Sequence, residues 1–385
     1  MTKRFNALKR LGQFTALAAA LTLSLAAKAD ITVGVSLPLT GPASGLGIPM
    51  ANGIKLWPTT IGDQKVRVIV LDDASDPSKG VQNARRLVAE EKVDVLVGSG
   101  ATPVAVAIAQ VASDTQTPQL ALSPAPMTQG KDTWLFRIPH HNGVMANAMV
   151  QHMKANGVKK VGFVGYTDAY GESWLVELKP RLEKAGIELV GVERFARTDA
   201  AITAQALKLT SAQPDAIVVV ASGSGAAMPQ LALVDRGFKG KVYQTHGAAT
   251  RDLIRVGGKA VEGAFVSSPT MVVADQLAAS HPLRAEGLKF VQAYEKANGE
   301  GSRNALGAHG LDAYLVLEKA VPLAIKKAKP GTPEFRAALR DALETMPPVT
   351  VTGGILKYSA SDHWGYAEDS AIIMKVVNGD WKLEQ

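Results

Sequence analysis

The 385-residue chain contains no cysteine. Disulfide bonds, thiolate metal sites, a cysteine nucleophile and a lipid attached to an N-terminal cysteine are therefore excluded. Signatures of catalysis are also missing: there is no GxxxxGKS/T phosphate loop, no GxSxG elbow and no HExxH pair among the seven histidines. Two short Gly-x-Gly turns, at 98–100 and 223–225, do not continue into GxGxxG. The sequence thus predicts no enzyme, no cofactor and no bound metal.

The first 29 residues have the pattern of an export signal. Basic residues at positions 3, 4, 9 and 10 precede an apolar stretch at 14–27, and Ala27-Lys28-Ala29 supplies a small-x-small cleavage pattern before Asp30. A membrane anchor is the alternative, but this stretch is shorter than the ~20 residues that cross a bilayer. No later segment is longer and equally apolar. We therefore expect export to the periplasm and no stable membrane insertion.

Positive charge is concentrated in that leader. The whole chain carries 42 Lys and Arg against 35 Asp and Glu, and residues 1–29 hold five of the basic residues and none of the acidic ones. The remaining 356 residues, 385 less 29, thus have 37 basic and 35 acidic side chains. This near balance, with no basic run containing aromatic residues, argues against a nucleic-acid partner. The length suggests two domains of ordinary size.

Short apolar runs alternate with amphipathic helical patterns along the first part of this mature chain. The segment 77–91 is predicted to be a helix with one apolar face, capped by Asp76 and begun by Pro77. Near-continuous apolar strands separated by helices indicate a parallel sheet covered on both faces. The predicted strands are residues 31–37, 66–71, 93–98 and 119–123.

The same alternation then starts again, which predicts a second α/β unit. Its expected strands are 160–166, 188–195, 216–221 and 242–246, with helices at 170–185, 200–212, 226–236 and 250–256. The section after residue 281 is mostly helical, and it is too small for a third domain, so it should complete the first two. Its predicted elements are helices at 282–297, 305–324 and 333–345 and strands at 354–358 and 370–377.

The turn at 98–103 is suited to binding an anion. It leaves a strand and enters a helix, where free N–H groups and the positive helix end favour negative charge. Thr102 either caps this helix or donates its hydroxyl to a ligand, and one hydroxyl can do both. A second strand end, at 123–128, has two prolines and several small residues and is either an ordinary loop or part of the same site. Asp72, Asp73 and Asp76 lack the spacing of a calcium loop and are interpreted as solvated or capping carboxylates.

Several motifs resemble the periplasmic leucine/isoleucine/valine-binding type of solute-binding protein that serves ABC importers. Residues 31–42 (ITVGVSLPLTGP) look like its opening strand and loop, and residues 71–77 (LDDASDP) are similar to its segment after the second strand. Residues 167–172 (TDAYGE) and 261–264 (VEGA) match two further motifs. The motifs occur in the family's order between Asp30 and Asn378.

This resemblance implies the type I binding-protein fold, in which two doubly wound parallel-sheet lobes are joined by a hinge of three crossovers. The expected N-terminal lobe comprises residues 30–142 with 270–361. The C-terminal lobe comprises residues 143–269 with 362–385. It further implies that the lobes close around a ligand without converting it.

The resemblance also implies ligand-binding positions. Thr102 falls where the family holds the ligand carboxylate with a hydroxyl. Ala125 falls where main-chain groups meet the ligand, and Met127, or Thr128 after a shift of one residue, falls where a threonine assists. Tyr170 matches the aromatic residue that the second lobe lowers onto the ligand.

The departures from the family pattern concern the ligand's identity. His246 stands where amino-acid binders carry the acidic partner of the ligand ammonium, and an imidazole cannot take that role. Leu46 and Ser222 replace aromatic residues and Gly100 replaces a bulkier one, which predicts a roomier pocket. His309 lies near one more wall position or packs in the core. A disulfide of some members would join the positions of Ser75 and Ala101 and cannot form here.

These features predict a monomeric periplasmic protein that presents a small carboxylate ligand to an ABC importer permease. The expected ligand is an aromatic acid of the benzoate or cinnamate kind. Binding of a branched-chain or other hydrophobic amino acid for transport is one alternative, and a sensory module that presents its ligand to a receptor is another.

Overall fold

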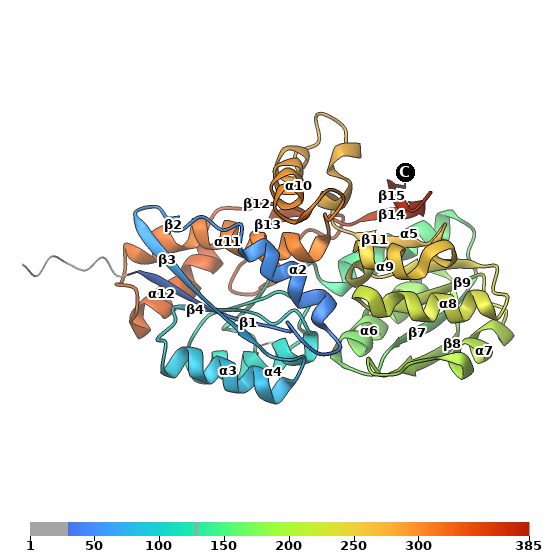
Figure 1. Cartoon of the computed structure of the whole chain (residues 1–385), viewed down its shortest axis with the longest axis horizontal. Helices are drawn as coiled ribbons and strands as arrows, with labels where there is room; N and C mark the ends of the chain where they lie inside the picture. Colours follow the sequence, from blue (N-terminus) through green and yellow to red (C-terminus); the bar gives the residue numbers. More distant parts are fainter. Residues whose placement is uncertain (1–29, 128–129, 385) are drawn as a thin grey trace, which may run out of the picture.

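The computed structural model describes residues 30–127 and 130–384, so the export signal predicted for residues 1–29 lies outside the described residues. Figure 1 shows two α/β lobes side by side along the long axis of the molecule. None of the helices in the described ranges has both the length and the apolar character needed to span a bilayer.

The first lobe is built on a six-stranded sheet with the order β2-β3-β1-β4-β5-β6. All neighbouring pairs are parallel except β2 with β3. The central strand β1 is buried along almost its whole length, as its continuous apolar sequence predicts. The bounds are β1 Ile31–Leu37, β2 Thr60–Ile61, β3 Gln64–Asp72, β4 Val95–Gly98, β5 Gln119–Ala121 and β6 Leu135–Arg137.

Helices cover both faces of this sheet. Two of them pack together on one face and three on the other (Figure 1). The α3 helix begins as predicted, because Pro77 occupies its first turn and the Asp76 carboxylate accepts a hydrogen bond of 3.0 Å from Lys79 N. The first face carries α3 Pro77–Ala89 and α4 Thr102–Asp114, and the second carries α2 Ser44–Ile54, α11 Ala305–Ile325 and α12 Pro333–Thr345.

The second lobe contains a seven-stranded sheet with the order β15-β14-β11-β10-β9-β7-β8. Only β14 and β15 run antiparallel to their neighbours. Its strands are β7 Lys160–Tyr166, β8 Glu188–Phe195, β9 Ala216–Val220, β10 Lys241–Gln244, β11 Phe265–Ser268, β14 Ile372–Val377 and β15 Asp380–Leu383. Its helices are α5 Asn142–Ala155, α6 Ala169–Ala185, α7 Thr203–Ser211, α8 Ala227–Asp235 and α9 Arg251–Gly257, with 3-10 turns η1 Gly223–Ala226, η2 His246–Ala248 and η3 Gly258–Val261.

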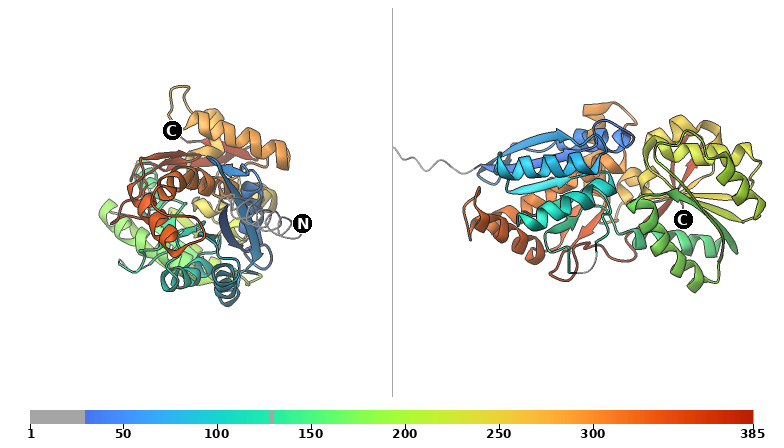
Figure 2. Two further views of the ribbon diagram at one scale, coloured as in Figure 1. Left: turned by 90° about the vertical axis from the view of Figure 1, so that its left-hand side faces the viewer. Right: turned by 90° about the horizontal axis from the view of Figure 1, so that it is seen from below.

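The chain passes between the two sheets three times, after β6, after β11 and before β14. The C-terminal part completes both lobes, as expected: α11 and α12 belong to the core of the first, and β14 and β15 to that of the second. The view from below in Figure 2 shows the orange helices beside the blue-to-cyan elements. The lobe boundaries at 142/143, 269/270 and 361/362 stay a prediction. The connecting elements are η4 Thr270–Gln276, α10 Arg284–Asn298 and the hairpin of β12 Val349–Val351 and β13 Gly354–Leu356.

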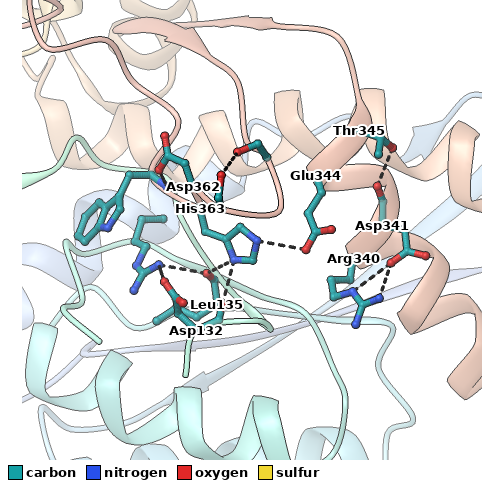
Figure 3. A network of polar contacts seen from close by, with 12 residues as sticks. Asp132, Leu135, Arg340, Asp341, Glu344, Thr345, Asp362 and His363 are labelled. Carbon is teal, nitrogen blue, oxygen red and sulfur yellow. Dashed lines mark hydrogen bonds and ion pairs between the residues drawn. The ribbon is translucent and has the colours of Figure 1, made fainter. Parts of the chain in front are cut away.

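The segment before the third crossover is fastened to the first lobe by a buried histidine (Figure 3). His363 Nδ1 lies 2.9 Å from the carbonyl oxygen of Asp132 and 3.1 Å from that of Leu135, while Nε2 lies 3.2 Å from Glu344 Oε1. Its ring stacks on Phe136 with 4.0 Å between centroids. Since carbonyl oxygens only accept, Nδ1 must carry a proton. This end of the hinge is therefore held by polar contacts as well as by packing.

Most predicted elements are confirmed, with differences at their ends. The strands at 31–37, 160–166 and 188–195 have the predicted bounds. The strand expected at 119–123 stops at Ala121, because the chain bends at Leu122 and Ser123. The strand expected at 242–246 stops at Gln244, where the chain turns into η2. The strand expected at 354–358 is the short β13 of a hairpin and lies outside both large sheets.

Candidate functional site

A cavity lies between the lobes at the carboxyl ends of several strands. This is the place where open α/β sheets bind ligands. Both lobes contribute walls. Six of the eight predicted binding residues line it: Leu46, Gly100, Thr102, Tyr170, Ser222 and His246.

The first lobe presents two hydroxyls that its own fold does not use. Thr102 does not cap helix α4, contrary to one of the two predicted roles; the N-cap is Ala101, and no side chain bonds to the helix end. Within the described residues Thr102 makes no hydrogen bond, and it is almost fully buried. Ser123 Oγ is buried and also lacks a partner in the described part of the chain. Both residues line the cavity beside the free N–H groups that begin α4.

The loop after β5 lines the cavity with residues that come earlier in the sequence than those predicted. Leu122, Ser123 and Pro124 form the wall, whereas Ala125 and Met127 are not among the described lining residues. The Ala125 carbonyl oxygen accepts a hydrogen bond of 3.0 Å from Arg137 Nε, which directs it into the lobe. Met127 packs on the small cluster that contains Ala125. Thr128, the alternative to Met127, lies outside the described residues.

The second lobe positions Tyr170 through the start of helix α6. The Asp168 carboxylate accepts hydrogen bonds from Tyr170 N and Gly171 N and so caps this helix. The phenol of Tyr170 donates to Thr245 Oγ1 at 2.8 Å. Burial raises the pKa of Tyr170 to about 12, so the phenol stays protonated at neutral pH. Its oxygen remains able to accept a further hydrogen bond.

Arg197 is the principal lining residue that the sequence analysis missed. Its Nε contacts Asp168 Oδ2 at 2.5 Å, its Nη1 donates to Ser222 Oγ at 2.9 Å, and the guanidinium lies 4.0 Å from the centre of the Tyr166 ring. It follows β8 by two residues, at the carboxyl end of a parallel strand. Arg197 could have been predicted as a site residue from this position, because open α/β sheets bind ligands at the carboxyl ends of their parallel strands. Ser123 and Pro124 belong to the strand end at 123–128, for which a place in the site was one of the two interpretations. The remaining lining residues that were not predicted are Met50, Leu122, Pro139, Gly247 and Leu306.

Two histidines of the cavity are neutral at physiological pH. Burial, and next the nearby His309, lower the pKa of His246 to about 3, and burial lowers the pKa of His309 to about 4. Within the described residues His246 Nδ1 and both ring nitrogens of His309 have no hydrogen-bond partner. Each neutral ring has one N–H donor and one acceptor to offer. His309 is thus a wall residue, the first of the two roles considered for it.

The apolar wall is less open than the small residue at position 100 suggests. A Cβ placed on Gly100 would lie 2.4 Å from Met50 Sδ, so the methionine of helix α2 fills the space that a larger residue would occupy. The expected extra room is therefore not found at this position. Leu46, Met50, Leu122 and Leu306 together offer an apolar surface to a ligand.

The aspartates at 72, 73 and 76 serve the local structure, as interpreted from their spacing. Asp72 accepts from the backbone of Leu39 and Thr40, and Asp73 accepts from the hydroxyls of Ser36 and Ser99. No cluster of three or more potential metal-ligating carboxylates or histidines occurs in residues 30–127 and 130–384.

Comparisons with known proteins agree with this architecture. The family described as periplasmic binding protein matches residues 30–380. The Leu/Ile/Val-binding protein homolog 3 of Brucella melitensis biotype 1 is 26% identical over 354 residues, which cover 89% of this chain and 91% of the relative. An extracellular ligand-binding receptor from Rhodopseudomonas palustris HaA2 is 42% identical, with a TM-score of 0.90 over 92% of this chain and 100% of that one.

A more distant structure shares the fold alone. It is a solute-binding protein of an ABC transporter from R. palustris in complex with benzoate, 21% identical, with a TM-score of 0.78 over 92% of this chain and 95% of that one. The type I fold and the relationship expected from the motifs are thereby confirmed.

Proposed function

Because this chain belongs to the periplasmic binding protein family, in its leucine/isoleucine/valine-binding type, we propose that it captures a small carboxylate ligand for an ABC importer. The proposed ligand is an aromatic acid of the benzoate or cinnamate kind. The protein releases this ligand unchanged to a permease and acts as a monomer in the periplasm, to which residues 1–29 direct it.

The observation that carries this proposal is that no acidic side chain is found among the described residues of the cavity wall. Arg197, His246 and His309 line the cavity, and no Asp or Glu occurs among its described lining residues. An α-amino acid brings an ammonium group, which is costly to bury without an anionic partner. An acid without an ammonium group has no such need. The composition of the wall therefore favours the acid over leucine, isoleucine or valine.

The ring of such an acid suits the remaining wall. Leu46, Met50, Leu122 and Leu306 supply apolar contacts, and small-molecule sites are typically lined mostly by apolar side chains with a few polar groups. A protein of the same fold holds benzoate, which supports an acid of this size in this architecture.

Capture begins on the first lobe in this proposal. The hydroxyls of Thr102 and Ser123 and the N–H groups that begin helix α4 bind the carboxylate. Closure then brings the second lobe over the ring, with the guanidinium of Arg197, paired with Asp168, on the opposite side of the cavity. The ligand stabilises the closed form only through its greater affinity for that form.

A thermal-shift comparison tests the class of ligand. Benzoate or cinnamate is expected to raise the melting temperature of the purified protein by several degrees at 100-fold the Kd, because binding to the folded state adds about 2.7 kcal/mol there. Leucine is expected to leave the melting temperature unchanged. Stabilisation by leucine and not by the aromatic acids would assign the protein to amino-acid transport. Copurification with a receptor in place of a permease would favour the sensory module.

Closure is expected to depend on the small residue at position 45. A methyl group on Gly45, in helix α2, would lie 3.8 Å from Ser224 N and 4.0 Å from Asp252 Oδ2, so the lobes meet here in ordinary contact. Gly45→Trp should hold the lobes apart and raise the Kd for benzoate or cinnamate by about tenfold or more, since fewer molecules can close. Calorimetry measures the change.

The matched control for this variant is Gly45→Ala. Its methyl group fits at the distances given, so affinity should stay at the wild-type value. Equal affinities of the alanine and tryptophan variants would show that binding does not require the closed arrangement.

A further inference from the structure

A buried histidine–aspartate pair stands directly behind the cavity. His309, on helix α11, lines the cavity, and its Nδ1 lies 4.0 Å from Oδ2 of Asp312 one turn further along. Asp312 is 1% exposed and accepts hydrogen bonds of 2.9 Å from both the backbone N and the hydroxyl of Thr352. These bonds fix the carboxylate while leaving the imidazole without a hydrogen-bond partner among the described residues. The pair is thus arranged to stabilise an imidazolium that faces the cavity.

A bound acid leaves its negative charge uncompensated in this cavity. Arg197 already has Asp168 as its ion-pair partner, so together they add no net charge. Burial keeps the pKa of His246 at about 3 and that of His309 at about 4, so both rings are neutral at physiological pH. An isolated carboxylate is costly to bury. A proton taken up beside it would remove most of this cost.

Among the titratable groups near the cavity, His309 is the one placed to hold that proton. His246, from η2, packs against the rings of both Tyr170 and Trp174. His140, from the first crossover, stacks on Tyr366 at 3.7 Å, and burial keeps its pKa well below the ordinary value. In the described ranges neither His140 nor His246 forms an ion pair.

The charged groups on the far side of the pair affect His309 through the ionisation of Asp312. Burial raises the pKa of Asp312 to about 7, and the charge of Glu286 on α10 adds a smaller upward effect. The Asp312 carboxyl is therefore ionised only above about pH 7, and its ionised form is the one that favours an imidazolium at His309.

We propose that His309 meets the acid group of the ligand as an imidazolium, positioned and stabilised by Asp312, so that binding takes up a proton. This rests on the proposed function, since it requires an anionic ligand. When Asp312 is ionised, the proton comes from solvent. When Asp312 is protonated, the proton moves from its carboxyl to the imidazole and none is taken from solvent.

Proton uptake therefore has a defined pH dependence. Well above pH 7 binding should take up nearly one proton, and the Kd should rise as pH rises, by up to tenfold per pH unit. Below pH 7 uptake should fall towards zero and the Kd should level off. Calorimetry of wild-type protein with benzoate or cinnamate at pH 6 and pH 8, in buffers of different ionisation enthalpy, measures both quantities.

Three variants assign the proton to a residue. His309→Gln should abolish the uptake at pH 8 and raise the Kd at pH 6 by about tenfold or more, the effect of losing a hydrogen bond to a charged group. Asp312→Asn should remove the change of slope near pH 7 in the plot of log Kd against pH. This variant keeps the proposal testable if His309→Gln does not fold. His281→Gln, at a histidine outside the cavity lining, should leave uptake and Kd unchanged.

The outcomes separate this inference from the proposed function. Binding of the acids with no uptake at pH 8, or uptake that persists in His309→Gln, overturns the inference and leaves the function standing; persistent uptake would place the proton on Asp312. If no acid binds to the wild-type protein, both fail together.

Discussion

Replacing Arg197 by alanine is expected to weaken binding of benzoate or cinnamate by about 1.5–3 kcal/mol, or roughly 10- to 150-fold in Kd. The variant loses the one arginine among the described lining residues, and it leaves the Asp168 carboxylate beside the cavity without its partner. An anionic ligand would then face negative charge in place of a neutral ion pair. Isothermal titration calorimetry measures the loss.

Replacing Asp168, the ion-pair partner of Arg197, should strengthen the binding of acids. Asp168→Asn keeps an oxygen that can cap helix α6, because asparagine is a favourable N-cap residue. It removes the negative charge that neutralises Arg197, so acids should bind more tightly than to the wild type. Weaker binding by this variant would show that Arg197 has to be held by Asp168 in order to reach the ligand.

Arg194→Ala is the matched control for charge. Arg194 lies near the end of β8, the strand that precedes Arg197, but it pairs with Glu172 at the surface, where its side chain is 41% exposed. Surface pairs contribute little, so both affinity and stability should change by less than about 1 kcal/mol. If Arg197→Ala bound acids as well as this control, Arg197 would have no part in the site.

Arg137→Met is expected to lower the free energy of unfolding by roughly 3 kcal/mol, the lower end of the usual cost of removing one member of a buried ion pair, because the Asp132 side chain that loses its partner is 25% exposed. Arg137 is fully buried in strand β6. Its Nη1 donates to Asp132 Oδ2 at 2.7 Å, and its Nε donates to the carbonyl oxygen of Ala125. Methionine would fill part of the volume but would leave both acceptors without this donor.

Denaturant titration followed by tryptophan fluorescence measures this effect. The matched control is Arg67→Met, since Arg67 pairs with Glu91 at 3.0 Å with its side chain 53% exposed, and the expected loss is below about 1 kcal/mol. Equal midpoints for the two variants would mean that the buried pair adds no stability. Retained acid binding by folded Arg137→Met is also expected, because Arg137 is not among the described residues that line the cavity.

The loop from Leu122 to Met127 shows why part of the site could not be assigned from sequence. Family positions placed the ligand contact at Ala125 and Met127, whereas the structure turns Ser123 towards the cavity and Ala125 towards Arg137. A loop with two prolines has no regular side-chain period. Its register depends on the residues that its backbone meets, and Arg137 lies 12 positions away in another element.

Two histidines, by contrast, could be placed from the sequence. His246 was predicted to line the site because the family resemblance puts it where amino-acid binders carry an acidic residue, and the cavity includes it. The spacing of His309 and Asp312 puts both on one face of helix α11, which periodicity alone indicates. The sequence could not show how His309 and Asp312 would interact with a ligand. That interaction depends on their burial, and their burial is set by the second lobe and by the β12–β13 hairpin.

The amino-acid sequence by itself determined the alternation of strands and helices, the start of α3 at Asp76 and the absence of cysteine chemistry. Each of these depends on residues within a few positions of one another. Tertiary structure alone decided that Arg197 joins Ser222 and Asp168 at the cavity, that Met50 occupies the space beside Gly100, and which hydroxyls stay free. These pairings join side chains that are far apart along the chain, and close packing of whole elements, which no local pattern encodes, brings them together.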